Sequence, residues 1–68
     1  MNRKELVQDM KGEIGSFPST SQIAKYMRVS RDKVRNMVAG LEYIEDGKSK
    51  RYFVNDVVGR LLEQKGVN

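Results

Sequence analysis

The spacing of apolar and polar residues divides the chain into three helical segments, an alternating segment and a fourth helical segment. Asn2 and Glu5 form a capping-box pattern, which predicts a first helix over about residues 3–13. Ser19 and Gln22 repeat this pattern and predict a second, shorter helix in the sequence TSQIAKYM. The chain is therefore expected to begin with two helices, each opened by a side-chain cap.

A third helix is predicted after a tight turn at RVS, in which Val29 points inward. Ser30 is expected to cap this helix, because its hydroxyl can accept a hydrogen bond from a free backbone N–H in the first turn. Gly40 is expected to help end it. One continuous apolar stripe runs along the helix at positions i, i+3, i+4 and i+7, and it consists of Val34, Met37, Val38 and Leu41.

Beyond residue 42 the apolar period changes from that of a helix to that of a strand. Tyr43–Asp46 and Arg51–Val54 alternate and flank an Asp-Gly turn, so they are predicted to form a two-stranded hairpin. Asn55 is expected to cap a last helix that ends at Gly66. The buried stripe of that helix is expected to be Val57, Val58, Leu61 and Leu62. The predicted fold class is mainly α with a small β-hairpin, in the order α-α-α-β-β-α, and residues 1–68 form one domain.

The aromatic residues and the methionines are assigned to packing. Phe17 is predicted to anchor the core, and the four methionines are predicted to fill it. Tyr43, Tyr52 and Phe53 could stack on nucleic-acid bases, but their alternation in a hairpin over a small core favours packing.

The composition argues against catalysis and metal binding. The 68 residues include no histidine and no cysteine, which removes the commonest general base, the commonest metal ligand and any disulfide. Glu45 and Asp46 are adjacent on a predicted strand, so they face opposite sides and do not form a paired carboxylate site. We expect a protein that is not an enzyme and that holds no cofactor and no metal. Because the apolar runs are short, neither a membrane span nor a secretory leader is expected, and the predicted location is cytoplasmic.

The net charge of +4 is concentrated in one short segment. Residues 25–35 carry five basic residues against one acidic residue, and this difference of four equals the excess of the whole chain. Such a concentration is typical of a protein that binds a polyanion. A solvated helix face is the alternative explanation, and the charge pattern alone does not separate the two.

The sequence IAKYMRVSRDKVRNMV resembles the DNA-binding helix-turn-helix of bacterial and phage regulators. The positions that carry the resemblance are Ile23, Ala24, Met27, Val29, Ser30 and Val34. Small Ala24 matters physically, because the second helix of the motif crosses close to the first. Arg28 is a departure, since such turns commonly place glycine there. A positive φ would cost a non-glycine residue on the order of 1 kcal/mol, so the turn is expected to differ slightly from the usual one.

The flanking residues narrow the resemblance. FPSTSQIAKYMRVSRDKVRNMVAGLEYI is similar to the reader head of GntR-type winged helix-turn-helix regulators, whereas GLEYIEDGKSKRYFVNDVVGRLL is similar to the excisionase family and to MerR-like phage proteins. The excisionase-like interpretation is preferred. It implies a winged helix-turn-helix that binds double-stranded DNA in a phage or mobile element, with several copies assisting an integrase in DNA recombination. A small protein of transcription regulation is the alternative, and a winged-helix protein-interaction module is an alternative from another class.

The resemblance implies that the third helix lies in a DNA major groove with its outward residues at the base edges. Arg35 could then bind guanine O6 and N7, and Asn36 could bind adenine N6 and N7. Asp32 complements the helix dipole or accepts a hydrogen bond from a cytosine amine. The base-reading candidates are Arg31, Lys33, Arg35 and Asn36. The DNA-backbone candidates are Thr20, Ser21, Lys25, Arg28 and Ser30, and a flexible cationic hairpin tip adds Lys48, Ser49, Lys50 and Arg51.

Overall fold

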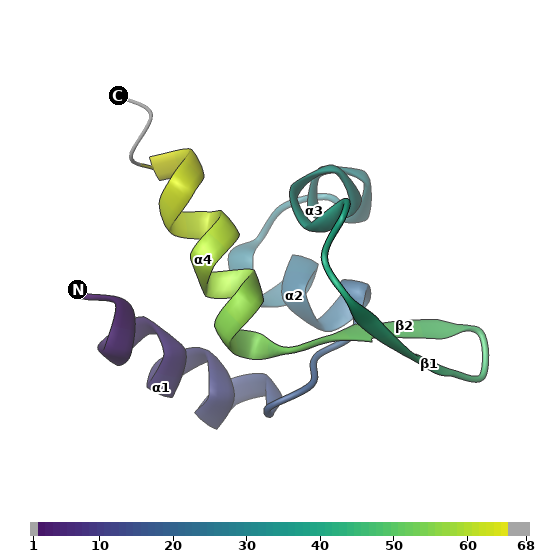
Figure 1. The fold of residues 1–68 in the computed structure, drawn as a ribbon, viewed down its shortest axis with the longest axis horizontal. Coiled ribbons are helices and arrows are strands. Elements are labelled where there is room, and N and C mark those ends of the chain that lie inside the picture. Colours follow the sequence, from purple (N-terminus) through teal and green to yellow (C-terminus); the bar gives the residue numbers. More distant parts are fainter. Residues whose placement is uncertain (1, 66–68) are drawn as a thin grey trace.

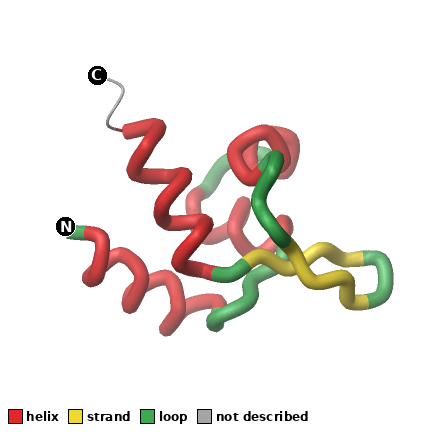
Figure 2. Tube along the Cα trace, in the orientation of Figure 1, coloured by secondary structure: helices red, strands yellow, loops and turns green. Residues whose placement is uncertain are grey.

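The computed structural model describes residues 2–65. Within this range, four helices and one antiparallel two-stranded sheet follow each other in the order α1, α2, α3, β1, β2, α4 (Figures 1 and 2). The helices are α1 (Arg3–Ile14), α2 (Thr20–Met27), α3 (Arg31–Val38) and α4 (Val54–Lys65), and the strands of the hairpin are β1 (Tyr43–Asp46) and β2 (Ser49–Tyr52). The predicted element order and the predicted mainly α class with a small β-hairpin are confirmed. Over the described residues, no helix combines the length and the apolar character needed to cross a membrane.

Side-chain caps open the first three helices, as the sequence predicts. At α1, the N–H of Glu5 donates to Oδ1 of Asn2 at 2.8 Å, and the N–H of Asn2 donates back to Oε1 of Glu5 at 3.0 Å. At α2, the N–H of Gln22 donates to Oγ of Ser19 at 3.3 Å, and the reciprocal bond is 2.9 Å long. Oγ of Ser30 accepts a first-turn N–H of α3 at 3.2 Å. Each cap satisfies backbone donors that have no partner within the helix.

The core lies where α1 and α4 pack against α2, α3 and the base of the hairpin (Figure 1). All four helices and β2 contribute fully or almost fully buried residues. Those residues are Met10, Ile23, Ala24, Val34, Met37, Val38, Tyr52, Val54, Val57 and Val58. The first residues of the stripes predicted for the third and fourth helices are buried, while Leu41, Leu61 and Leu62 pack at the edge of the core.

Phe17 is not a core anchor, because 44% of its surface is exposed. Its ring lies 5.6 Å from that of Phe53, which is also exposed, so the prediction that Phe53 packs in the core is wrong as well. The reason is a backbone pairing: the carbonyls of Ser16 and Pro18 accept from the N–H groups of Val54 and Tyr52 at 2.9 and 3.0 Å. Side chains alternate along such an extended segment, so buried Pro18 turns its neighbour Phe17 outward.

The hairpin turn is tighter than predicted. Asp46 pairs directly with Ser49, so only Gly47 and Lys48 lie in the loop, and the φ of 63° at Gly47 is the one that a type II′ turn requires at its first central position. This register ends β2 at Tyr52, so the second strand is Ser49–Tyr52 and its bounds lie two residues before the predicted Arg51–Val54. It also leaves Tyr43 exposed beside buried Tyr52, which corrects its predicted packing in the core.

The start of α4 differs from the prediction, whereas α3 ends just before the predicted terminator Gly40, which has a φ of 87°. α4 begins at Val54, because the carbonyl of Phe53 accepts from two N–H groups of its first turn; Asn55 is therefore inside the helix and does not cap it. α3 ends at Val38, where Nη1 of Arg60 donates to the carbonyls of Met37 and Ala39 at 3.0 and 2.8 Å. A side chain from α4 thus satisfies the end of α3. The predicted terminator Gly66 and the predicted core residue Met1 lie outside the described residues.

The turn between α2 and α3 has the usual left-handed form, contrary to the expectation drawn from its arginine. Arg28 has φ 59° and ψ 46°. The N–H of Val29 donates to the carbonyl of Ala24 and the N–H of Arg28 to that of Lys25, which together make a Schellman motif. Arg28 stands where glycine is commonest in such a motif, so the backbone strain falls on this residue.

Replacing Arg28 by glycine is therefore expected to raise the free energy of unfolding by about 0.5–1 kcal/mol, which is the left-handed penalty less the entropy that glycine loses on folding. Urea denaturation followed by circular dichroism measures this change. Arg28→Ala is the matched control, because alanine keeps the penalty, and its expected effect is within about 0.5 kcal/mol. Destabilisation by Arg28→Gly would show that the arginine side chain stabilises the turn.

Candidate nucleic-acid interface

A hollow of about 550 Å³ lies between α3, the hairpin and the first turn of α2. We call it the α3–hairpin groove. In Figure 1, α3 and the hairpin lie on the right-hand side, away from α1 and α4 on the left. Its lining residues are Ser19, Thr20, Ser21, Arg31, Arg35, Val38, Ala39, Gly40, Leu41, Lys48, Ser49, Lys50 and Tyr52. Four cationic side chains from two separate elements, together with a helix N-terminus, thus converge on one concave surface.

The groove brings together candidates from all three predicted sets. They are the base-reading candidates Arg31 and Arg35, the backbone candidates Thr20 and Ser21, and the hairpin candidates Lys48, Ser49 and Lys50. On α3, burial of Val34, Met37 and Val38 fixes the rotation of the helix, and successive residues are about 100° apart. Arg31 and Arg35 consequently lie on the flank that faces the hairpin.

The remaining predicted residues of α3 are exposed but do not line the groove. Asp32 and Asn36 lie on the side of the helix opposite its buried face, whereas Lys33 lies on the flank away from the hairpin. Ser30, predicted to contact the DNA backbone, uses its hydroxyl to cap the helix. The exposed face of α3 therefore has an outward side carrying Asp32 and Asn36 and a groove side carrying the arginines.

Lys25 and Arg28 are separated from the groove. They line a second hollow of about 540 Å³, whose other residues include Asp9 and Glu13 of α1 and Tyr26 of α2. The predicted backbone contacts from these two residues thus fall next to carboxylates. The surface that carries them is less favourable for phosphate than the groove, where arginine and lysine are the charged lining residues.

Tyr26 joins α1 to α2 beside this second hollow. Its hydroxyl donates a hydrogen bond to Oδ2 of Asp9. Partial burial, followed by the hydrogen bond and the negative charge of Asp9, raises the pKa of Tyr26 to about 12. The phenol therefore remains a neutral donor at physiological pH, and its role is to hold the two helices together.

Asp32 and Arg35 form an ion pair one turn apart on α3. Both side chains are well exposed, at 86% and 60%, so solvent screens the pair and its contribution to stability is small. A ligand group that binds the guanidinium of Arg35 must share it with Asp32 or displace this carboxylate. Sequence reasoning gave Asp32 a role toward the helix dipole, and the structure adds this contact with Arg35.

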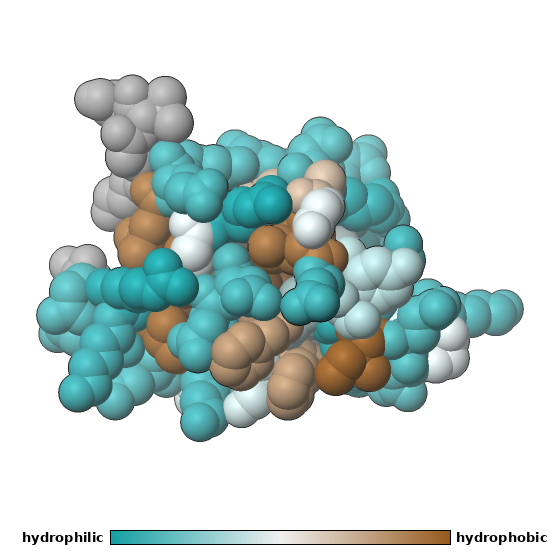
Figure 3. Space-filling view, viewed as in Figure 1, coloured by the Kyte–Doolittle hydropathy of each residue, from teal (hydrophilic) through white to brown (hydrophobic). Residues whose placement is uncertain are grey.

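Lys50 is held on the groove side of the hairpin by an aromatic ring. Its Nζ lies 4.7 Å from the centroid of the Tyr43 ring, a cation–π distance, and that ring is itself 5.9 Å from the ring of Tyr52. Toward its tip, the hairpin is covered mainly by hydrophilic residues, as the right-hand side of Figure 3 shows. Exposed Tyr43 therefore supports a lysine that lines the groove.

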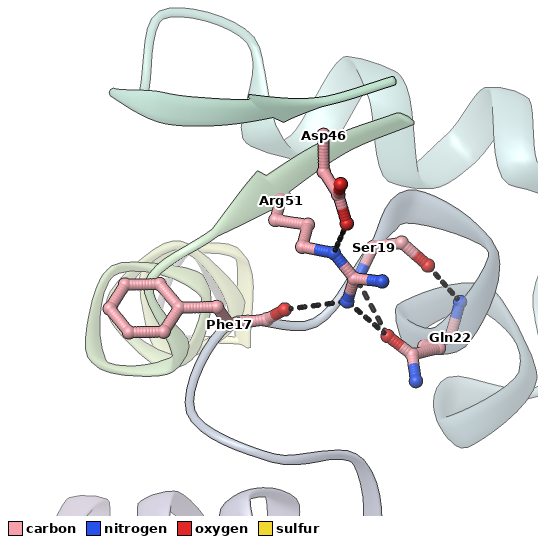
Figure 4. Close-up of polar contacts among 5 residues, drawn as sticks. All are labelled: Phe17, Ser19, Gln22, Asp46 and Arg51. Carbon is pink, nitrogen blue, oxygen red and sulfur yellow. Dashed lines mark hydrogen bonds and ion pairs between the residues drawn. The ribbon is translucent and has the colours of Figure 1, made fainter. Parts of the chain in front are cut away.

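The prediction of a flexible tip that contains Lys48, Ser49, Lys50 and Arg51 is wrong. Ser49, Lys50 and Arg51 belong to β2, and only Gly47 and Lys48 form the turn. The guanidinium of Arg51 points toward the protein and bonds to other residues there (Figure 4). Asp46 and Arg51 flank a tight turn, which was the available signal for their ion pair. The local sequence gave no signal for the bonds of Arg51 to Phe17 and Gln22.

No protein-family model, curated protein or solved structure matches this chain.

Proposed function

We propose that this chain is a winged helix-turn-helix domain that binds double-stranded DNA, with α3 as the reading helix and the hairpin as the wing. The observation that carries the proposal is the convergence of Arg31 and Arg35 with Lys48 and Lys50 on one groove. Cations on α3 and on the hairpin can neutralise DNA phosphates at two places along the duplex. This neutralisation releases condensed counterions, and the release supplies most of the non-specific affinity for DNA.

The geometry supports different contacts along this surface: base contacts from α3 and phosphate contacts from the hairpin and the start of α2. A major groove about 12 Å wide admits an α-helix, and the outward side of α3 carries Asn36, which can pair with adenine. Arg35, between the outward side and the groove, can reach guanine O6 and N7. Lys48 and Lys50 then meet phosphates, and the free N–H groups at the start of α2 provide a further phosphate contact.

Among DNA-binding roles, we favour an accessory protein of recombination in a phage or mobile element, as the resemblance to excisionases implies. Such a protein binds near recombination sites in several copies and assists an integrase. The small transcriptional regulator would use the same groove contacts, so the arrangement of binding sites on DNA distinguishes the two roles.

Selection of bound sequences from a random duplex pool tests the proposal. The expected result is an enriched site containing a guanine whose enrichment depends on Arg35. Tandem direct repeats would favour the recombination role, and a palindrome would favour a dimeric regulator. Absence of any duplex binding would overturn the proposal and leave the protein-interaction module as the better account.

A further inference from the structure

The guanidinium of Arg51 joins three parts of the chain that are separate in sequence (Figure 4). Its Nε donates to Oδ2 of Asp46, at the end of β1, at 2.9 Å. Its Nη1 donates to the carbonyl oxygen of Phe17 at 3.1 Å and to Oε1 of Gln22, in α2, at 3.4 Å. Within residues 2–65, no other side-chain hydrogen bond joins the hairpin to the rest of the protein.

We infer that Arg51 is a positioning residue for DNA binding: it holds the hairpin at the angle at which Lys48 and Lys50 reach the duplex. Arg51 itself does not touch DNA. The inference rests on the proposed function, because it concerns how the same groove is kept in shape.

Backbone contacts hold only the base of the hairpin. Ser19 forms an isolated β-bridge with Arg51, and the N–H of Tyr52 donates to the carbonyl of Pro18. Lys48 lies three residues nearer the tip, which corresponds to about 10 Å along a strand. A tilt of about 20° at the base would move the tip by about 3.5 Å, more than the length of a hydrogen bond. A two-stranded hairpin is marginal by itself, so its angle depends on this attachment.

The register places Arg51 on the opposite face of the hairpin from Lys50. Successive strand residues face opposite sides, so Lys50 and its partner Glu45 share one face, while Arg51 and its partner Ile44 share the other. Lys50 lines the α3–hairpin groove, whereas Arg51 does not. The guanidinium is also already engaged by Asp46 and the segment before α2. Its orientation therefore suits an internal link and not a phosphate contact.

Hydrogen exchange in the free protein tests the link without DNA. Arg51→Met keeps most of the aliphatic stem and removes the guanidinium. The expected result is faster exchange at the amides of Asp46 and Ser49, next to the turn, with little change at core amides of α3 such as that of Val38. Unchanged exchange at the hairpin would overturn the inference even if the wild type binds DNA.

Affinity measurements then test whether the link matters for DNA binding. The probes are the duplex selected from the random pool and a truncated duplex that covers only the contacts of α3. On the longer duplex, Arg51→Met and the double variant Lys48→Ala/Lys50→Ala are each expected to lose roughly three- to tenfold in affinity. The triple variant should lose no more than the double variant, because Arg51 acts through the two lysines. On the truncated duplex, Arg51→Met should bind like the wild type.

Substitution of Asp46 tests the inference through the direction in which the affinity for DNA changes. Asp46→Asn removes a negative charge near DNA, and electrostatics alone would tighten binding. A neutral amide oxygen accepts from Nε of Arg51 less strongly than the carboxylate does, so the hairpin is expected to loosen and binding to weaken about two- to fivefold on the longer duplex. Glu45→Gln is the matched control, because it removes a neighbouring charge that has no bond to Arg51; it should bind at least as tightly as the wild type.

The outcomes separate the inference from the proposed function. A further loss in the triple variant, equal losses on both duplexes, or tighter binding by Asp46→Asn would each overturn the positioning role. Faster hairpin exchange in a protein that binds no duplex would instead retain the link and overturn the proposed function.

Discussion

An Arg35→Ala variant is expected to lose about five- to 150-fold in affinity for the selected duplex while its affinity for a scrambled duplex changes much less. A bidentate arginine–guanine pair discriminates against the wrong base by about 1–3 kcal/mol, and truncation removes both hydrogen bonds. Arg35 is the arginine of α3 whose position, between the outward side and the groove, suits such a contact. Selection repeated with the variant should show relaxed preference at one base position.

Lys50→Ala is the control for this prediction. Lys50 lines the groove from the hairpin and is placed to meet phosphate, so its removal should weaken binding to the selected and scrambled duplexes alike. Titration of both variants on both duplexes separates the two effects. Equal losses on the two duplexes for Arg35→Ala would show that this arginine also binds only the backbone, with base recognition falling to other residues of α3.

The second large effect is expected in the core, where Ile23→Ala should lower the free energy of unfolding by about 2–5 kcal/mol. Ile23 is fully buried in the cluster that α2 shares with the other helices. A chain of 68 residues is expected to have about 3–10 kcal/mol of stability, so this loss removes a large part of it. Urea denaturation followed by circular dichroism measures the change.

Ile44→Ala is the matched control for Ile23→Ala. It deletes the same atoms from an isoleucine of the hairpin whose surface is 53% exposed, and its expected effect is within about 0.5 kcal/mol. At temperatures at which the Ile23→Ala variant is unfolded, it should not bind DNA, and binding should return when the protein refolds on cooling. Equal destabilisation by the two substitutions would contradict the packing of α2 described above.

The features predicted well from the sequence depend on local contacts. The capping boxes of α1 and α2 bring together side chains and N–H groups three residues apart, so sequence spacing alone defines them. The apolar stripe of α3 has the same local character. These signals predicted the order of the elements and therefore the fold class.

The features predicted wrongly depend on contacts between distant segments. Phe17 and Phe53 are exposed because the segment before α2 pairs with the end of β2, a contact across more than thirty residues of sequence. The bonds of Arg60 to the carbonyls at the end of α3 were likewise missed, because this side chain comes from α4. Hydrophobicity and period describe a residue's own element and contain no information about such partners.

The candidate site divides in the same way. Helical geometry was sufficient to predict which side of α3 is exposed. It could not separate Arg31 and Arg35, which line the groove, from Lys25 and Arg28, which lie beside the carboxylates of α1. Nor could it show that Arg51 turns inward, because its partners Phe17 and Gln22 lie in another part of the chain.

Binding of duplex DNA by the α3–hairpin groove can be tested by a mobility-shift titration across a salt series. With three or more phosphates neutralised, log affinity should fall against log salt with a slope of about −2.7 or steeper, at about 0.9 per phosphate. Raising the salt from about 50 to 200 mM should then weaken binding at least about 40-fold. Lys48→Ala/Lys50→Ala should flatten the slope by up to about 1.8. A flat slope in the wild type, or a slope unchanged by the double variant, would contradict the account.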